Sequence, residues 1–335
     1  MKREVRAYIK ERARLTLLPL IYLSIAAVVI TFVCAYGTQK TEYGNSANYY
    51  AQLQLPLTVL IILSYVTPVF SFRIFKCRRN LDCLFALPIS RRALAVIHYF
   101  VGLIVLLVPF SLSYLTNFLL LLRYSAFLEL EYTVPCYFLC VFACVVMYTV
   151  FVFAFNEGNT VGDGIWLMLL WTFICACVAG AINVFVEEIL GKYNRYSYTV
   201  SFGIIFYCIW SIVQRYNLFV IGGTRSYDVT LETIINYQLL WLALAVAAFV
   251  LFLLFFDSKR TEKTEEITDS CFGFRVLVPL YAITGMMAFE VWDEPIFWAI
   301  IEALAFAGYA IYRRGLRYKR RDVIFLVSLA VFLLF

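Results

Sequence analysis

The chain has 335 residues, of which 63% are hydrophobic and only 15% are charged, and its formal net charge at pH 7 is +6. Soluble domains carry about 25% charged residues, so a chain of this length cannot cover its apolar surface with polar side chains and needs lipid as part of its solvent. Its basic residues are concentrated in the loops expected on one side of the membrane. Topology therefore explains the positive charge, and nucleic acid is not the expected partner.

Eight apolar runs follow one another along the chain. None alternates apolar and polar residues, so the runs favour helices over the strands of a barrel. Helices also satisfy the backbone hydrogen-bonding groups that hydrocarbon leaves without water. The sequence therefore predicts an all-α polytopic membrane protein. Its expected spans are residues 15–36, 51–72, 93–122, 135–155, 165–185, 237–256, 275–291 and 296–312.

The first fourteen residues predict an interfacial amphipathic helix ahead of the first span. Val5, Tyr8, Ile9 and Arg12 recur at three- and four-residue steps among basic neighbours, a pattern suited to lipid headgroups. A basic tail is the alternative interpretation. No small-residue cleavage site follows the apolar run, so we expect the first span to be retained rather than removed as a signal peptide.

Lysine and arginine counts predict the orientation. The segments 1–14, 73–92, 257–275 and 313–321 contain six, six, four and six basic residues, which is 22 of the 28 in the chain. All four segments fall on one side if the first span starts in the cytoplasm. The intervening loops 37–50 and 123–134 contain one basic residue each. The bias predicts a multi-pass protein of the cell membrane with a cytoplasmic N-terminus.

This orientation requires residues 186–236 to begin and end on the outer side. The segment has a short apolar centre, so we expect a re-entrant hairpin, and two crossings are the alternative. The predicted organisation is then a six-span core over 15–256, a cytoplasmic linker over 257–274, and C-terminal spans seven and eight with a basic tail over 275–335. The last apolar piece, 323–335, holds 13 residues and is too short to span a membrane.

The loop after the second span predicts a short amphipathic helix at about 78–90. Leu81, Leu84 and Phe85 fall on one helical face, with Asn80 as a cap, and Pro88 ends the segment. Ser90 is placed to cap the long helix that follows. Such a helix could present an apolar knob to a cytoplasmic partner, and an ordinary basic loop is the alternative.

The sequence gives little support for catalysis or metal binding. The ten cysteines include no C-x-x-C pair, His98 is the only histidine, and no G-x-x-x-x-G-K-[ST] phosphate loop occurs. We therefore expect no metal site, no catalytic residues and no ATP hydrolysis by this chain. Glu302 lies within an apolar run and is a candidate intramembrane functional acid, with a structural hydrogen-bonding role as the alternative.

Two short motifs resemble a known family. Basic residues, then Asn80-Leu81-Asp82 and Leu87-Pro88-Ile89-Ser90-Arg91, lead into a long span, and this pattern resembles permeases of ABC-2 type exporters. The similarity is closest to the subfamily associated with bacterial antimicrobial-peptide and drug export. The segment from Phe256 to Glu262 resembles a second element of that subfamily, although the Ala-Gly that often follows it is absent. Glu187 to Gly191 also resembles the family.

The resemblance implies a permease subunit that couples a separate ATPase to export of an amphipathic substrate such as a peptide, drug or lipid. ATP and Mg would be bound by two partner ATPase subunits, and a second permease, identical or related, would complete the channel. The residues that would contact the ATPase in a coupling helix are Arg78, Arg79, Asn80, Asp82, Leu84, Phe85, Leu87, Pro88, Ile89, Ser90 and Arg91. The alternatives are an ion-coupled secondary transporter and a non-transporting membrane scaffold or sensor.

Overall fold

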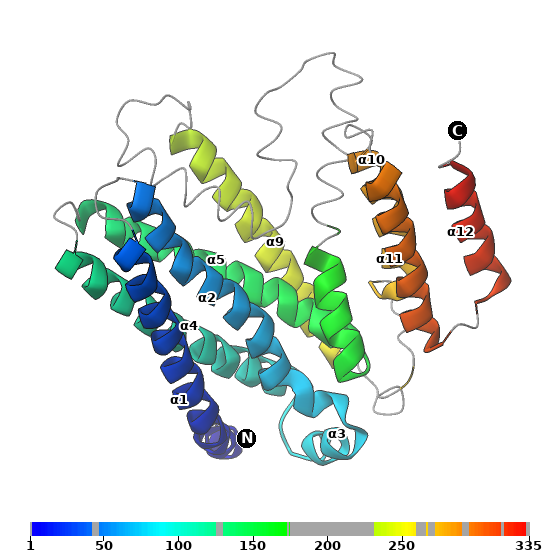
Figure 1. The fold of residues 1–335 in the computed structure, drawn as a ribbon. Coiled ribbons are helices and arrows are strands. Elements are labelled where there is room, and N and C mark those ends of the chain that lie inside the picture. Colours follow the sequence, from blue (N-terminus) through cyan, green and yellow to red (C-terminus); the bar gives the residue numbers. More distant parts are fainter. Residues whose placement is uncertain are drawn as a thin grey trace. The chain divides into compact units, whose positions relative to one another are not determined.

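The fold is seen in a computed structural model that describes residues 2–41, 47–124, 130–172, 174, 231–258, 266, 272–289, 295–315 and 318–332. Within these ranges the regular structure is helical and no strand occurs, so the predicted all-α class is confirmed there (Figure 1). The outer region at 186–230 and most of the 257–274 linker lie outside the described residues, and the predictions made for them stay predictions.

The helices follow the predicted apolar runs closely. A further helix, Val161–Thr172, follows α5 and covers the start of the predicted fifth span. The labelled elements are α1 (Lys2–Thr41), α2 (Ala47–Phe72), the 3-10 turn η1 (Arg73–Lys76), α3 (Arg78–Phe85), α4 (Arg91–Tyr124), α5 (Leu130–Glu157), α9 (Leu231–Asp257), α10 (Phe274–Phe289), α11 (Pro295–Arg313) and α12 (Arg320–Phe332).

Four helical stretches are long and apolar enough to cross a membrane, by length and composition. They are Arg3–Cys34, Thr58–Lys76, Arg91–Leu120 and Cys140–Glu157. They correspond to the first four predicted spans, and the chain is accordingly a membrane-embedded helical protein. The remaining spans of the six-span core, and spans seven and eight, stay predictions.

Helix α1 differs from the expected division at residue 14. It is a single helix of 40 residues that contains both the predicted interfacial segment and the first span. Pro19 lies inside it and has no N–H to donate to the carbonyl of Leu15, which loosens the helix close to the expected boundary. Figure 1 shows the first turns of α1 running in a different direction from the rest of the helix.

The chain divides into two compact units. Unit 1 comprises Met1–Phe153 and Ile209–Thr261, and unit 2 comprises Ala154–Cys208 and Glu262–Phe335. The predicted organisation, with a six-span core over 15–256, stays a prediction. Within unit 2, Leu167 and Ile174, from the predicted fifth span, are buried in one cluster with α10 and α11 residues such as Phe274 and Ile301.

Unit 1 is a bundle in which α4 is the central helix. It packs against α1, α2 and α9, and α1 also packs against α2 (Figure 1). Hydroxyl pairs join the helices at several levels, because polar side chains in an apolar bundle find partners on neighbouring helices. Thr31 on α1 bonds Ser113 on α4 at 2.6 Å, and Ser111 on α4 bonds Tyr137 on α5 at 2.8 Å.

Unit 2 contains the C-terminal helices, and sharp turns connect α11 to α12. The amides of Arg314 and Gly315 bond the carbonyls of Ile311 and Ala310 at 3.1 and 3.0 Å, which closes α11 with a Schellman motif. Asp322, in the first turn of α12, accepts a hydrogen bond from the Lys319 amide at 3.1 Å. Residues 323–332 of the predicted apolar tail belong to α12, a helix of 13 residues that begins at Arg320.

Candidate functional site: a surface platform and the polar junction beneath it

The segment that connects α2 to α4 contains the predicted short helix. We call residues 73–90, which include η1 and α3, the platform. Helix α3 begins at Arg78, because Cys77 is extended (φ −107°, ψ 121°) and its carbonyl accepts the first helical bond, from the Leu81 amide at 3.0 Å. No side chain caps this start. Asn80 lies inside the first turn, so its predicted capping role is wrong.

The far end of the platform agrees with the prediction. Helix α3 ends at Phe85, and Pro88 lies in the turn that follows. Ser90 caps α4, because its Oγ accepts a hydrogen bond from the Ala93 amide at 3.3 Å and its carbonyl accepts one from the Leu94 amide at 3.0 Å. The cap fixes the angle at which the platform meets α4.

The apolar face of α3 points inward. Leu81 and Leu84 are buried, with 0% and 8% of their surface exposed, and Phe85 is half-buried. This corrects the expected apolar knob. An eight-residue helix is not stable alone in water, and its apolar face is used to hold it against the bundle.

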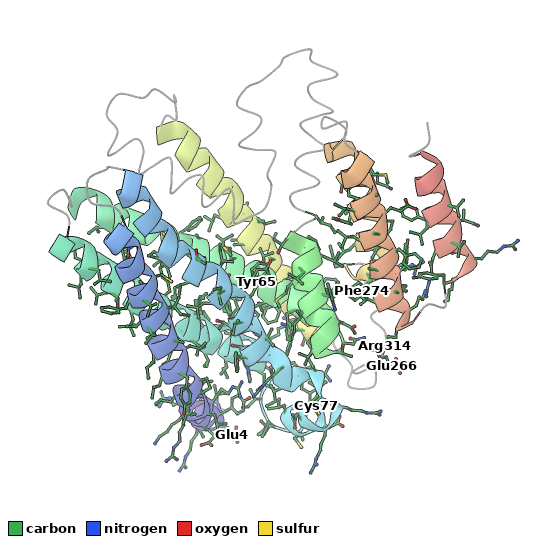
Figure 2. All side chains as sticks on the ribbon, viewed as in Figure 1. Glu4, Tyr65, Cys77, Glu266, Phe274 and Arg314 are labelled. Carbon is green, nitrogen blue, oxygen red and sulfur yellow. The ribbon has the colours of Figure 1, made fainter. Side chains whose placement is uncertain are left out.

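The predicted coupling residues therefore divide into three groups. Leu84 and Ile89 are buried, Phe85 is half-buried, and the others are exposed: Arg78, Arg79, Asn80, Asp82, Leu87, Pro88, Ser90 and Arg91. The surface that the platform offers to a partner is basic and polar. Figure 2 shows Cys77 of the platform and Glu4 of α1 toward the same end of unit 1, among side chains that end in nitrogen.

Aromatic rings anchor the platform to the bundle. Phe75 of η1 is fully buried, and its ring meets the rings of His98 on α4 and Phe256 on α9 edge-on, at centroid distances of 4.6 and 5.0 Å. Phe72, at the end of α2, packs edge-on against Phe252 of α9 at 5.4 Å. Edge-to-face pairs of this kind each contribute about 0.5–1.5 kcal/mol beyond burial, so Phe75 ties the platform to α4 and α9.

Two arginines connect the start of α4 to the end of α9. Arg92 forms an ion pair with Asp257 at 2.8 Å, and Arg91 Nη1 donates to the Asp257 carbonyl at 3.2 Å. The Arg91 guanidinium also lies 4.4 Å from the centroid of the Phe85 ring. Arg91 and Arg92 lie at the positive, N-terminal end of the α4 dipole, which disfavours their charges. The negative, C-terminal end of the α9 dipole offsets this effect. Arg91 is thus bound within the chain, although its residue type suggested a partner contact.

Beneath the platform lies a group of polar side chains that we call the polar junction: Tyr8, Arg12, Ser71 and His98. His98 is 1% exposed. Its Nδ1 lies 2.9 Å from the Ser71 carbonyl and its Nε2 lies 2.9 Å from the Tyr8 hydroxyl. A carbonyl only accepts, so Nδ1 carries the proton, and in the neutral ring Nε2 accepts from Tyr8. The only histidine therefore joins α1, α2 and α4 structurally.

A second polar group continues into α5. Tyr148 donates to the Tyr99 carbonyl at 3.1 Å and is hydrogen-bonded to the Ser71 side chain, and the Tyr99 hydroxyl bonds Thr149 at 2.7 Å. Gly102 of α4 faces this group, and a Cβ there would overlap Tyr148 Oη and Ser71 Oγ. No sequence pattern pointed to Tyr99, Tyr148 or Gly102, because isolated tyrosines and glycines are common in membrane helices.

Glu302 occupies the edge of a buried helix face in unit 2. It is half-buried beside Ile301, which is 3% exposed. Among the residues that the structure describes, Glu302 makes no hydrogen bond or ion pair. The ion pairs of unit 2 lie elsewhere: Arg313 binds Asp322 at 2.8 Å and Arg314 lies 3.5 Å from Asp163. The described residues therefore include no partner for the structural hydrogen bond that was the alternative interpretation of Glu302.

The described residues form no cluster of side chains that could hold a metal ion. No group of three or more histidine, cysteine or acidic side chains converges among them. Cys140 and Cys144 are buried cysteines one helical turn apart, and Cys77 and Cys83 are exposed cysteines on the platform.

No family model matches the chain, and no curated protein or solved structure matches it at a significant level. The likeness to ABC-2 permeases therefore rests on the short motifs quoted above. Two of these motifs, the platform with Arg91 and the segment that starts at Phe256, contact each other in unit 1.

Proposed function

We propose that the chain is the permease subunit of an ATP-driven ABC exporter and that the exposed side of the platform receives a partner ATPase. One observation carries the proposal: the platform projects a charged surface and is joined by buried contacts to α4 and α9. A force on its surface would reach these helices through packed side chains rather than through a flexible loop.

The proposed contact surface differs from the one expected from sequence. It comprises Arg79, Asn80, Asp82, Cys83 and Leu87, which are exposed. The charges suit an acidic or mixed groove on a soluble ATPase. Arg91 and the buried Leu84 act as supports for this surface.

The export role is tested by ATP-dependent activity of the reconstituted complex. If a neighbouring gene encodes an ATPase with a G-x-x-x-x-G-K-[ST] phosphate loop, the chain should stimulate its ATP hydrolysis, and Arg79→Glu should remove the stimulation. Arg321→Glu, at an exposed residue of α12, is the matched charge reversal and should retain it. Equal stimulation by wild type and Arg79→Glu would contradict the proposed contact.

A further inference from the structure

Two neighbouring helices of unit 1 change from apolar to basic surface at the same level. On α1 the exposed large apolar residues run continuously from Leu15 onward, whereas Lys10 and Arg14 before it are exposed and charged. On α2 the last exposed large apolar side chain is Phe70, and the exposed Arg73 follows three residues later. A membrane helix makes this change where hydrocarbon gives way to headgroups.

Arg12 and Arg73 both lie at this level. Arg12 Nη2 reaches the carbonyl of Ser71, two residues before Arg73, at 3.4 Å, and the two guanidinium groups are near enough to repel each other. Neither arginine forms an ion pair with a carboxylate among the described residues. Their two positive charges are therefore not offset by an ion pair within the described residues.

The hydrogen-bonding capacity of Arg12 is also unfilled. Its Nε is buried, and no acceptor of the described residues lies within hydrogen-bonding range of it. The one bond that its guanidinium donates to a described residue, Ser71, is long. A buried donor without an acceptor destabilises the folded state, so an anion that accepts from Nε would stabilise the folded chain.

We propose that Arg12 and Arg73 form a binding site for the phosphate of an anionic phospholipid. Phosphate oxygens match the fork of N–H groups on a guanidinium, and two guanidiniums can share one phosphate. The surroundings favour a lipid over a free phosphate ion. Arg73 lies 5.5 Å from the centroid of the Phe70 ring, and exposed Phe70 and Leu15 offer apolar surface to the acyl chains just below the headgroup.

The site has a structural consequence for the polar junction. The Ser71 carbonyl accepts from both Arg12 and His98, so a phosphate that holds Arg12 also fixes the meeting point of α1, α2 and α4. Lipid bound here would stabilise the base on which the platform stands. This inference requires only that the chain is membrane-embedded and does not depend on the exporter proposal.

Native mass spectrometry of the purified full chain tests the site. The protein is incubated with equimolar phosphatidylglycerol and phosphatidylcholine of identical acyl chains, and the ratio of the two bound lipids is measured. We expect the wild type to retain phosphatidylglycerol preferentially. Arg12→Gln and Arg73→Gln should each lower that preference about tenfold, since each removes a charge-assisted hydrogen bond to the phosphate that Arg14 does not make. Arg14→Gln, on the same helix, is the matched loss of charge and should leave the preference unchanged.

Thermal unfolding of each variant shows whether it is folded, and Arg73→Gln carries the test if Arg12→Gln is not, because Arg73 is exposed. An unchanged lipid preference in folded Arg73→Gln would overturn the site. An equal loss in Arg14→Gln would overturn it too, because the effect would then come from overall charge. Stabilisation of the wild type by inorganic phosphate, without any preference between the lipids, would overturn the assignment to a lipid.

Discussion

At the scale of single residues, Gly102 decides how closely three helices approach. Ser71 of α2 and Tyr148 of α5 occupy the space where a Cβ at position 102 would lie. The hydroxyl of Tyr148 donates to the Tyr99 carbonyl, so it cannot move aside without losing a buried hydrogen bond. Small residues serve this purpose in membrane bundles, where packing replaces much of the hydrophobic driving force.

Gly102→Ala should therefore destabilise unit 1 by about 1–3 kcal/mol, the usual cost of forcing an extra carbon into a packed core. The measurement is the thermal unfolding midpoint in detergent. Gly162→Ala is the control, because the nearest atom to its added Cβ is Thr160 Oγ1 at 3.9 Å. If the two variants unfold at the same temperature, the close approach at Gly102 is not a constraint.

Residue patterns predicted local backbone features better than they predicted burial. Ser90 was identified as a cap because a serine ahead of an apolar helical run is a local signal. The direction of the Leu84 face could not be predicted, because a two-turn amphipathic helix shows which residues share a face but not what that face meets. Arg91 was placed among the partner contacts for the same reason, since its bond to the Asp257 carbonyl depends on the distant helix α9.

At the scale of elements, α3 has a buried face that holds it against the bundle and an exposed face. Substitutions can test the two faces separately. Leu84→Asp places a carboxylate where 8% of the side chain is exposed, and burying an unpaired charge costs several kcal/mol. It should detach α3 and lower the unfolding midpoint. Leu87→Asp, at a residue 36% exposed, should leave the midpoint nearly unchanged and weaken only partner binding. Equal destabilisation by both variants would contradict the inward orientation of α3.

The ion pair between α4 and α9 contributes through geometry more than through energy. The side chains of Arg92 and Asp257 are 63% and 40% exposed, and exposed pairs contribute about 0–1 kcal/mol. Asp257→Ala should therefore cost no more than about 1 kcal/mol in stability, and the charge-swapped double variant, Arg92→Asp with Asp257→Arg, should recover most of that loss. A cost of several kcal/mol in a thermal or denaturant unfolding experiment would show that the pair is more buried than the structure has it.

At the scale of the whole molecule, hydrophobicity and helix length were predictable and grouping was not. The first four predicted spans coincide with the four helical stretches that are long and apolar enough to cross a membrane. The grouping of 154–208 with the C-terminal helices is not encoded locally, because it depends on Leu167 packing with residues more than a hundred positions later, such as Phe274. Apolar runs alone do not encode such pairings.

The most direct test of the exporter account is co-purification of the tagged full chain in mild detergent, with the eluate examined for a bound ATPase. The account predicts a stoichiometric soluble subunit that carries a G-x-x-x-x-G-K-[ST] phosphate loop. That subunit should be lost from folded Arg79→Glu and Leu87→Asp variants and retained by Arg321→Glu. Recovery of the folded chain alone, without ATPase activity, would contradict the account and would make Glu302→Gln, in an ion-dependent flux assay, the next variant to measure.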